Sequence, residues 1–121
     1  MATNYGISMC RRIVSHVAKE GVAIISGMAA GIDGVAHSTV LDHHDKVINA
    51  LSEVSDSVAL TVGVLGCGID KIYPAENRKL FNRMYEQGVV ISEYPPGTEP
   101  VRHHFPLRNR IISGLSDGVL V

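Results

Sequence analysis

The chain has 121 residues, of which 45% are apolar and 19% charged. This balance is typical of one globular domain over residues 1–121 and excludes a disordered chain. The net charge of −1, from 11 basic and 12 acidic residues, excludes a uniformly basic surface, so any affinity for nucleic acid must come from a local cluster. No signal peptide or membrane-spanning run is recognisable, so we expect a cytoplasmic protein without membrane contact, in which Cys10 and Cys67 are reduced.

Hydrophobic periodicity predicts helices and strands that alternate along the whole chain. In chain order, the expected elements are a helix over 7–20, a strand over 22–25, a helix from about Gly34 to about Leu51 or to a break near His43, a polar loop over 52–57, a strand over 58–65, a helix from Pro74 to Gly88, a strand over 89–91, a helix from Pro106 to Gly118 and a strand over 119–121. Such alternation is typical of an α/β Rossmann-like fold, a parallel sheet with helices on both faces. Because the chain begins just before a helix and stops inside a strand, we expect this domain to be truncated at both ends.

The turn after the first expected strand is the most informative candidate site. It reads Ser26-Gly27-Met28-Ala29-Ala30-Gly31. Its small residues let backbone N–H groups approach an anion, and the following helix N-terminus adds partial positive charge. The turn matches neither a dinucleotide fingerprint nor a Walker loop. Two interpretations stay open, a phosphate-binding turn or a tight connection without a ligand. Asp33 is expected to cap the next helix. For both Asp33 and His37 two roles stay open, shaping the turn or facing a ligand.

A basic and aromatic segment after the proline-rich loop 94–100 is the second candidate. It reads Arg102-His103-His104-Phe105-Pro106-Leu107-Arg108-Asn109-Arg110 and contains no acidic residue. Bases stack on aromatic rings and guanidinium groups bind phosphates, so the segment suits a nucleic acid. In the alternative interpretation Phe105 belongs to the core and the arginines are solvated or paired with carboxylates. Tyr73 and Tyr94 lie on neighbouring loops, where they either face the site or pack.

Signals of catalysis or metal binding are weak. His43, His44 and Asp45 are adjacent and point to different sides of a helix, which favours a solvated surface over a metal site. Glu93 follows a strand, but it has no partner carboxylate or nucleophile at a recognisable spacing. The sequence therefore predicts a protein that is not an enzyme and has no metal or cofactor.

Four motifs resemble the signatures of the DprA/Smf family of DNA-processing proteins. They are Ser26–Asp33 with Ala36 and His37, which resemble SGxAxGID and AH; Val64–Asp70 with Tyr73, Pro74 and Asn77, which resemble VLGxGxD and YPxxN; and Ile91–Pro95 and Phe105–Ser116, which resemble the last two. The motifs stand in the family's order and cover nearly the whole chain. The resemblance therefore concerns the chain as a whole and does not depend on one short segment.

The resemblance implies an extended Rossmann fold that binds single-stranded DNA and loads the RecA recombinase during natural transformation and recombination. It further implies a homodimer without established enzymatic activity. The residues expected at the DNA or its phosphates are Ser26, Gly27, Met28, Ala29, Gly31, Arg102, Phe105, Arg108, Asn109 and Arg110. The residues expected to shape the site are Asp33, His37, Gly66, Gly68 and Asp70.

The chain also departs from the family pattern. The family's opening strand and everything after the fourth strand are absent, and residues 43–57 look like an insertion. Because the absent strand normally lies centrally in the sheet, we expect the isolated chain to be unstable, aggregated or swapped. The alternative function is that of a nucleotide-binding protein or a nucleoside-monophosphate phosphoribohydrolase of the lysine decarboxylase-like type, whose PGGxGT loop the sequence does not contain.

Overall fold

The computed structural model describes residues 1–50 and 59–121 and is built on a parallel sheet. The strands β1 (Ile24–Ser26), β2 (Thr61–Leu65) and β3 (Val89–Ser92) lie in the order β1-β2-β3. In this register Ser26 lies opposite Gly63, and Leu65 lies opposite Ser92. Because the strands are parallel, the turns that follow them meet at one edge of the sheet.

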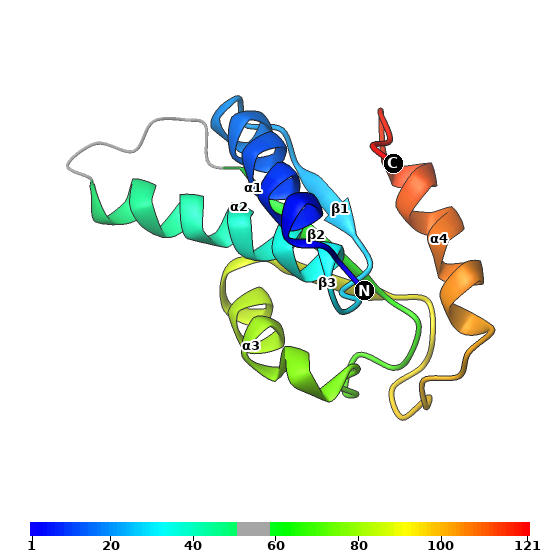
Figure 1. Ribbon diagram of the computed structural model, residues 1–121. Helices are drawn as coiled ribbons and strands as arrows, with labels where there is room; N and C mark the ends of the chain where they lie inside the picture. Colours follow the sequence, from blue (N-terminus) through cyan, green and yellow to red (C-terminus); the bar gives the residue numbers. More distant parts are fainter. Residues whose placement is uncertain (51–58) are drawn as a thin grey trace.

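Helices cover both faces of this sheet, as the sequence predicts. They are α1 (Asn4–Lys19), α2 (Ile32–Asn49), the short 3-10 helix η1 (Ala75–Asn77), α3 (Arg78–Gln87) and α4 (His104–Leu115). Helix α2 packs against the helices α1 and α3 and against the strands β1 and β2. Helix α4 packs mainly on β1 and β2. Figure 1 shows α2 and α3 on one side of the sheet, with α1 along α2, and α4 on the other side. The predicted α/β fold is confirmed.

The core consists of two apolar clusters that share helix α2. The larger one, between α2, α3 and the sheet, contains Met28, Leu41, Leu65, Cys67, Leu80, Phe81 and Met84. The smaller one, between α1 and α2, contains Val14, Ala18, Ala36, Val40 and Ala59. Leu80, Phe81 and Met84 thus turn one face of α3 into the core, and both clusters fix the first half of α2, which follows the turn after β1.

Local hydrogen bonding moves several helix boundaries away from the predicted ones. Helix α1 begins at Asn4, because the Thr3 side chain accepts a hydrogen bond from the Gly6 N–H at 3.0 Å and caps the helix. Helix α2 runs unbroken to Asn49, so of the two predicted ends the one near Leu51 is supported and the break near His43 does not occur. Helix α4 begins two residues before Pro106, which its first turn tolerates because the N–H groups there have no partner within the helix.

The predicted fourth strand over 119–121 does not form. These residues are exposed and belong to no strand in the described part of the chain. A strand exists only through pairing with a neighbouring backbone, and a short β-branched run without such a neighbour stays irregular. The predicted loop 52–57 and the beginning of the strand predicted over 58–65 lie outside the described residues, as does the insertion beyond Ala50.

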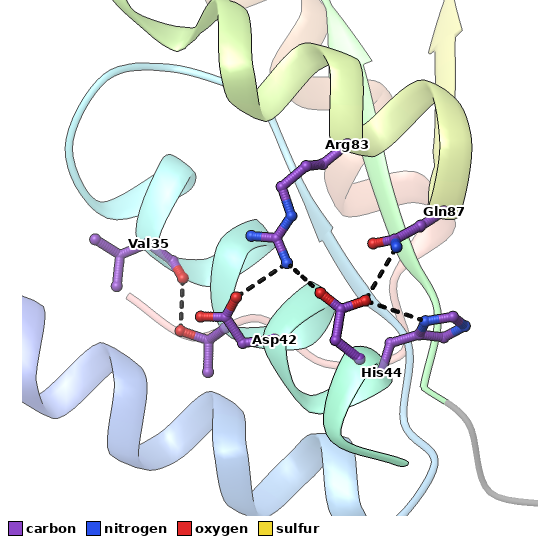
Figure 2. A network of polar contacts seen from close by, with 7 residues as sticks. Val35, Asp42, His44, Arg83 and Gln87 are labelled. Carbon is purple, nitrogen blue, oxygen red and sulfur yellow. Dashed lines mark hydrogen bonds and ion pairs between the residues drawn. The ribbon is translucent and has the colours of Figure 1, made fainter. Parts of the chain in front are cut away.

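A polar network joins α2 to α3 on the surface (Figure 2). The Arg83 guanidinium donates to Asp42 at 3.0 Å and to Asp45 at 3.1 Å, and Gln87 donates to the second oxygen of Asp45 at 3.0 Å. The side chain of His44 lies 4.0 Å from the same carboxylate. Asp45 therefore takes part in a helix–helix contact while its side chain stays 42% exposed, so the group lies on the surface, as the sequence favours, and also joins α2 to α3. Among the described residues, no group of three His, Cys, Asp or Glu side chains could hold a metal ion.

The described part of the chain contains no helix long and apolar enough to cross a membrane.

Candidate functional site

Asp33 closes the turn that follows β1. Its carboxylate accepts hydrogen bonds from the backbone N–H groups of Gly27 and Ala29, both at 3.2 Å. The N-cap position of α2 belongs to Gly31, so the cap predicted at Asp33 is wrong, because the carboxylate bonds back into the turn from the first turn of the helix. The N–H groups of Gly27 and Ala29, which were expected to bind an anion, thus already donate to the negatively charged Asp33.

Met28 and Ser26 of the turn are held in the fold on the core side. Met28 has a φ of 61°, and its fully buried side chain belongs to the larger core cluster. Asn77 donates from its side chain to the Met28 carbonyl at 3.0 Å, which ties the start of α3 to the turn. Ser26 lies half-buried at the end of β1. Met28 is 0% exposed, main chain included, so it supports the turn from the core and offers no surface to a ligand.

Arg108 connects α4 to the carboxyl ends of β1 and β2. Its side chain is buried, and Nη1 donates to the carbonyls of Gly27 at 2.7 Å and Val64 at 2.8 Å. Gly27 has to be glycine, because a Cβ atom there would lie 2.7 Å from the Arg108 Cζ. Burial lowers the pKa of the guanidinium, and the nearby Asp33 opposes that effect. Nε donates to Asn109 at 3.2 Å, and among the described residues Nη2 has no hydrogen-bond partner, so Nη2 is the donor left for a ligand.

An aromatic pair stands beside this guanidinium. The Phe105 ring lies one helical turn before Arg108, whose Cζ is 5.3 Å from the ring centroid. Tyr73 stacks on Phe105, with centroids 5.5 Å apart and an interplanar angle of 27°. Gly66 gives the ring room, since a Cβ atom there would lie 2.8 Å from Phe105 Cδ1. Phe105 is half-buried, whereas Tyr73 is 49% exposed.

These groups enclose a small pocket at the carboxyl edge of the sheet. Its volume is about 200 Å³, and it is lined by Gly27, Ala29, Ala30, Tyr73, Pro74, Phe105 and Arg108. The fold thus brings together part of the turn and part of the basic segment, which lie some eighty positions apart in the sequence. The volume is below the roughly 300 Å³ of pockets for drug-sized ligands, so the pocket suits one flat ring or one anionic group.

A second aromatic stack lies next to the pocket and was not predicted as a unit. The Nδ1–H of His104 donates to the Gly66 carbonyl at 3.0 Å, and Tyr94 stacks on His104 with centroids 4.1 Å apart. The exposed His103 ring packs edge-on against His104 at 4.8 Å. Both histidines belong to the basic segment recognised in the sequence. The stack of His104 on Tyr94 could not be predicted, because it depends on where α4 begins.

The three arginines of the basic segment do not form one cluster. Arg108 points inward, and Arg110, two residues later, is rotated by about 200° around the helix axis. Arg110 forms an ion pair with Glu93 at the end of β3. Arg102 is exposed before α4 and makes no ion pair among the described residues. Of these three arginines, Arg102 is the one that presents an exposed cation without an ion-pair partner among the described residues.

Gly68 and Asp70 shape the loop 94–100 and do not line the pocket. Asp70 accepts a hydrogen bond from the Gly97 N–H at 2.7 Å, which holds the pKa of that carboxyl below its usual value. The Gly68 N–H donates to the Thr98 carbonyl at 2.9 Å. The two residues thus fix the path of the loop that leads to α4.

His37 is fully buried beneath the sheet, outside the pocket lining. Thr61 donates to the Ile24 carbonyl at 3.0 Å, so the Thr61 hydroxyl oxygen accepts the Nδ1–H of His37, at 2.7 Å. Nε2 is then unprotonated, and it is buried without a partner among the described residues. Burial lowers the pKa of His37 to about 4, so the ring is neutral and serves the core.

A larger hollow of about 1030 Å³ runs along the outer edge of β1 between α1 and α4. Most of its lining is apolar and includes Val14, Val17, Ile24 and Ile112. The hollow reaches the carboxyl edge of the sheet, where ligands of α/β sheets bind, only at Ser26, Asp33 and Asn109–Arg110. None of the described residues that line it carries an aromatic ring, whereas the smaller pocket combines two aromatic rings with the Arg108 guanidinium. We therefore take the smaller pocket as the candidate site.

Comparison with known proteins relates this chain to DNA-processing proteins. The profile of the family described as DNA recombination-mediator protein A matches residues 1–121. Protein Smf of Synechocystis sp. is 44% identical over 119 residues, which cover 98% of this chain and 26% of Smf. Among solved structures, DNA processing protein A from Streptococcus pneumoniae matches with a TM-score of 0.77 at 33% identity, over 94% of this chain and 35% of that protein.

DNA processing protein A from Helicobacter pylori, whose structure is described as revealing its single-stranded DNA binding mode, also matches with a TM-score of 0.77. The identity is 29%, over 97% of this chain and 46% of that protein. This chain therefore spans less than half the length of each of these relatives.

Proposed function

The chain belongs to the DNA recombination-mediator protein A family, the family of the Smf and DprA proteins, and from this premise we propose that it binds single-stranded DNA at the pocket between the turn after β1 and α4. The observation that carries the proposal is the convergence of Tyr73, Phe105 and the free Nη2 of Arg108 on the small-residue turn. A flat aromatic wall beside a cation suits a nucleotide, because every base has a π-face and every phosphate accepts hydrogen bonds.

The charge distribution predicts binding with few phosphate contacts. The net charge is −1, two of the turn's N–H groups are bonded to Asp33, and Arg110 is paired with Glu93. Of the three arginines in the basic segment, exposed Arg102 and inward-facing Arg108 have no carboxylate partner among the described residues. We therefore expect stacking to contribute much of the affinity and the salt dependence to be shallow.

We also propose that the protein loads RecA on the bound strand, acts as a homodimer and works in the cytoplasm. These proposals are supported by family membership and by the motifs that resemble the DprA/Smf signatures. Co-sedimentation of the protein with RecA, with and without single-stranded DNA, tests the loading role. The protein's mass in solution tests the homodimer. If RecA sediments without the protein both with and without single-stranded DNA, the loading role is refuted.

We further propose that the protein is not an enzyme. Glu93, the carboxylate with the best position after a strand, forms an ion pair with Arg110, and no described contact activates a nucleophile next to it. The phosphoribohydrolase alternative has no specific observation in its favour.

A titration with three ligands tests the central proposal. Fluorescence anisotropy should report saturable binding of a labelled oligothymidylate, weaker binding of a duplex of the same length and no competition by AMP at comparable concentration. Tight binding of AMP without binding of the oligonucleotide would instead support the nucleotide-binding alternative.

A further inference from the structure

Phe105 offers little free ring surface to a base. Tyr73 stacks on it at 5.5 Å, the Arg108 guanidinium lies over it at 5.3 Å, and the Gly66 backbone touches one edge. The ring is half-buried as a result. A base that stacked directly on Phe105 would have to displace Tyr73 or Arg108, and Arg108 is held by the carbonyls of Gly27 and Val64.

Tyr73 has the free surface that Phe105 lacks. Its ring is 49% exposed and lines the pocket. The other tyrosines differ in this respect. Tyr5 is exposed on α1, Tyr85 donates its hydroxyl to the Ile69 carbonyl, and Tyr94 is stacked on His104. Among the described tyrosines, only Tyr73 combines an exposed ring with a place in the pocket wall.

The surroundings of Tyr73 hold its ring in a fixed position. Phe105 supports it from behind, and Asn77, four residues later, bonds to the Met28 carbonyl at 3.0 Å and so fixes the segment against the turn. Across the pocket stand Ala29 and Ala30, whose small side chains leave room. A ring that is already ordered loses little rotamer freedom when a ligand stacks on it.

From this geometry we propose that Tyr73 is the platform on which one base of the single strand stacks, with Phe105 as its support and Arg108 Nη2 as a donor to an oxygen of the same nucleotide. The proposal rests on the single-stranded DNA binding proposed above and names its stacking residue. Recognition through a π-face accepts any base, so the site has little sequence preference. It excludes duplex DNA, in which the bases are already stacked and paired.

A fluorescent variant tests this contact directly, because the chain contains no tryptophan. In Tyr73→Trp the new indole is the sole tryptophan. We expect an oligonucleotide to quench its emission and an abasic oligonucleotide of equal length and charge to leave the emission unchanged. Equal emission with both oligonucleotides under saturating conditions would contradict the proposal.

Affinities of matched variants give an independent test. Tyr73→Phe should keep wild-type affinity, whereas Tyr73→Leu, which is apolar but has no π-face, should weaken binding about tenfold with an unchanged salt slope. Tyr5→Leu, on the exposed surface of α1, is the control and should change nothing. Circular dichroism melts verify that each variant is folded, which we expect because Tyr73 is half-exposed.

The outcomes separate this inference from the proposed function. If the wild-type protein binds the oligonucleotide and folded Tyr73→Leu binds equally well, Tyr73 is not the platform and the proposed function stands. If the wild-type protein binds no single-stranded DNA, both the proposed function and this inference fail.

Discussion

Replacing Arg108 by methionine should destabilise the fold far more than replacing a neighbouring arginine. The change leaves the carbonyls of Gly27 and Val64 buried without their donor, at a cost of about 1–3 kcal/mol each. Loss of the cation–π contact with Phe105 adds about 0.5–1 kcal/mol. The variant no longer incurs the desolvation cost of burying the Arg108 cation, and this gain offsets part of the loss. We expect a net loss of about 3 kcal/mol in the free energy of unfolding.

Urea denaturation measures this loss. With a slope of about 2 kcal/mol per molar urea, Arg108→Met should lower the unfolding midpoint by about 1.5 M. Arg110→Met on the same helix is the matched control, because Arg110 forms only an exposed ion pair with Glu93. Such pairs contribute about 0–1 kcal/mol. Equal midpoints for the two variants would refute the claim that Arg108 joins α4 to the sheet.

Three further outcomes follow from the site and the core. The pKa of His37 is lowered from 6.5 to about 4, so between these values the unfolded chain binds a proton that the folded chain does not. Stability should therefore fall by up to roughly 3 kcal/mol as the pH drops through this window, and urea midpoints of His37→Gln should lack this component. Arg102→Ala should lower the slope of log K against log salt by roughly 0.7, while Arg12→Ala, on the exposed face of α1, should not. Finally, neither the wild-type protein nor Glu93→Gln should release adenine from AMP in a chromatographic assay; release that depends on Glu93 would contradict the non-enzymatic proposal.

The architecture could be predicted from the sequence because the relevant signals are local. The periodicity of Leu80, Phe81 and Met84 places one face of α3 in the core, and short β-branched runs mark the three strands. The meeting of the turn with α4 follows from parallel topology, which puts every strand end at one edge. The strand predicted over 119–121 failed because propensity cannot supply a pairing partner.

The roles of individual site residues could not be predicted because they depend on distant partners. An arginine such as Arg108 is usually exposed, and its burial requires both a glycine at position 27 and two carbonyls from different strands. The Asp33 carboxylate reaches the N–H groups of Gly27 and Ala29 because α2 begins at Ile32. Tyr73 and Phe105 are 32 positions apart in the sequence, and no local pattern indicates that they stack.

Photo-crosslinking tests the central claim, DNA binding at this pocket, most directly. An oligonucleotide containing iodinated uracil would be irradiated in complex with the protein, and the cross-linked peptides would be identified by mass spectrometry. The pocket predicts adducts on Tyr73 or Phe105, the aromatic residues of its wall. Adducts confined to Tyr5 or Tyr85, which are exposed on α1 and α3, would contradict the proposed site.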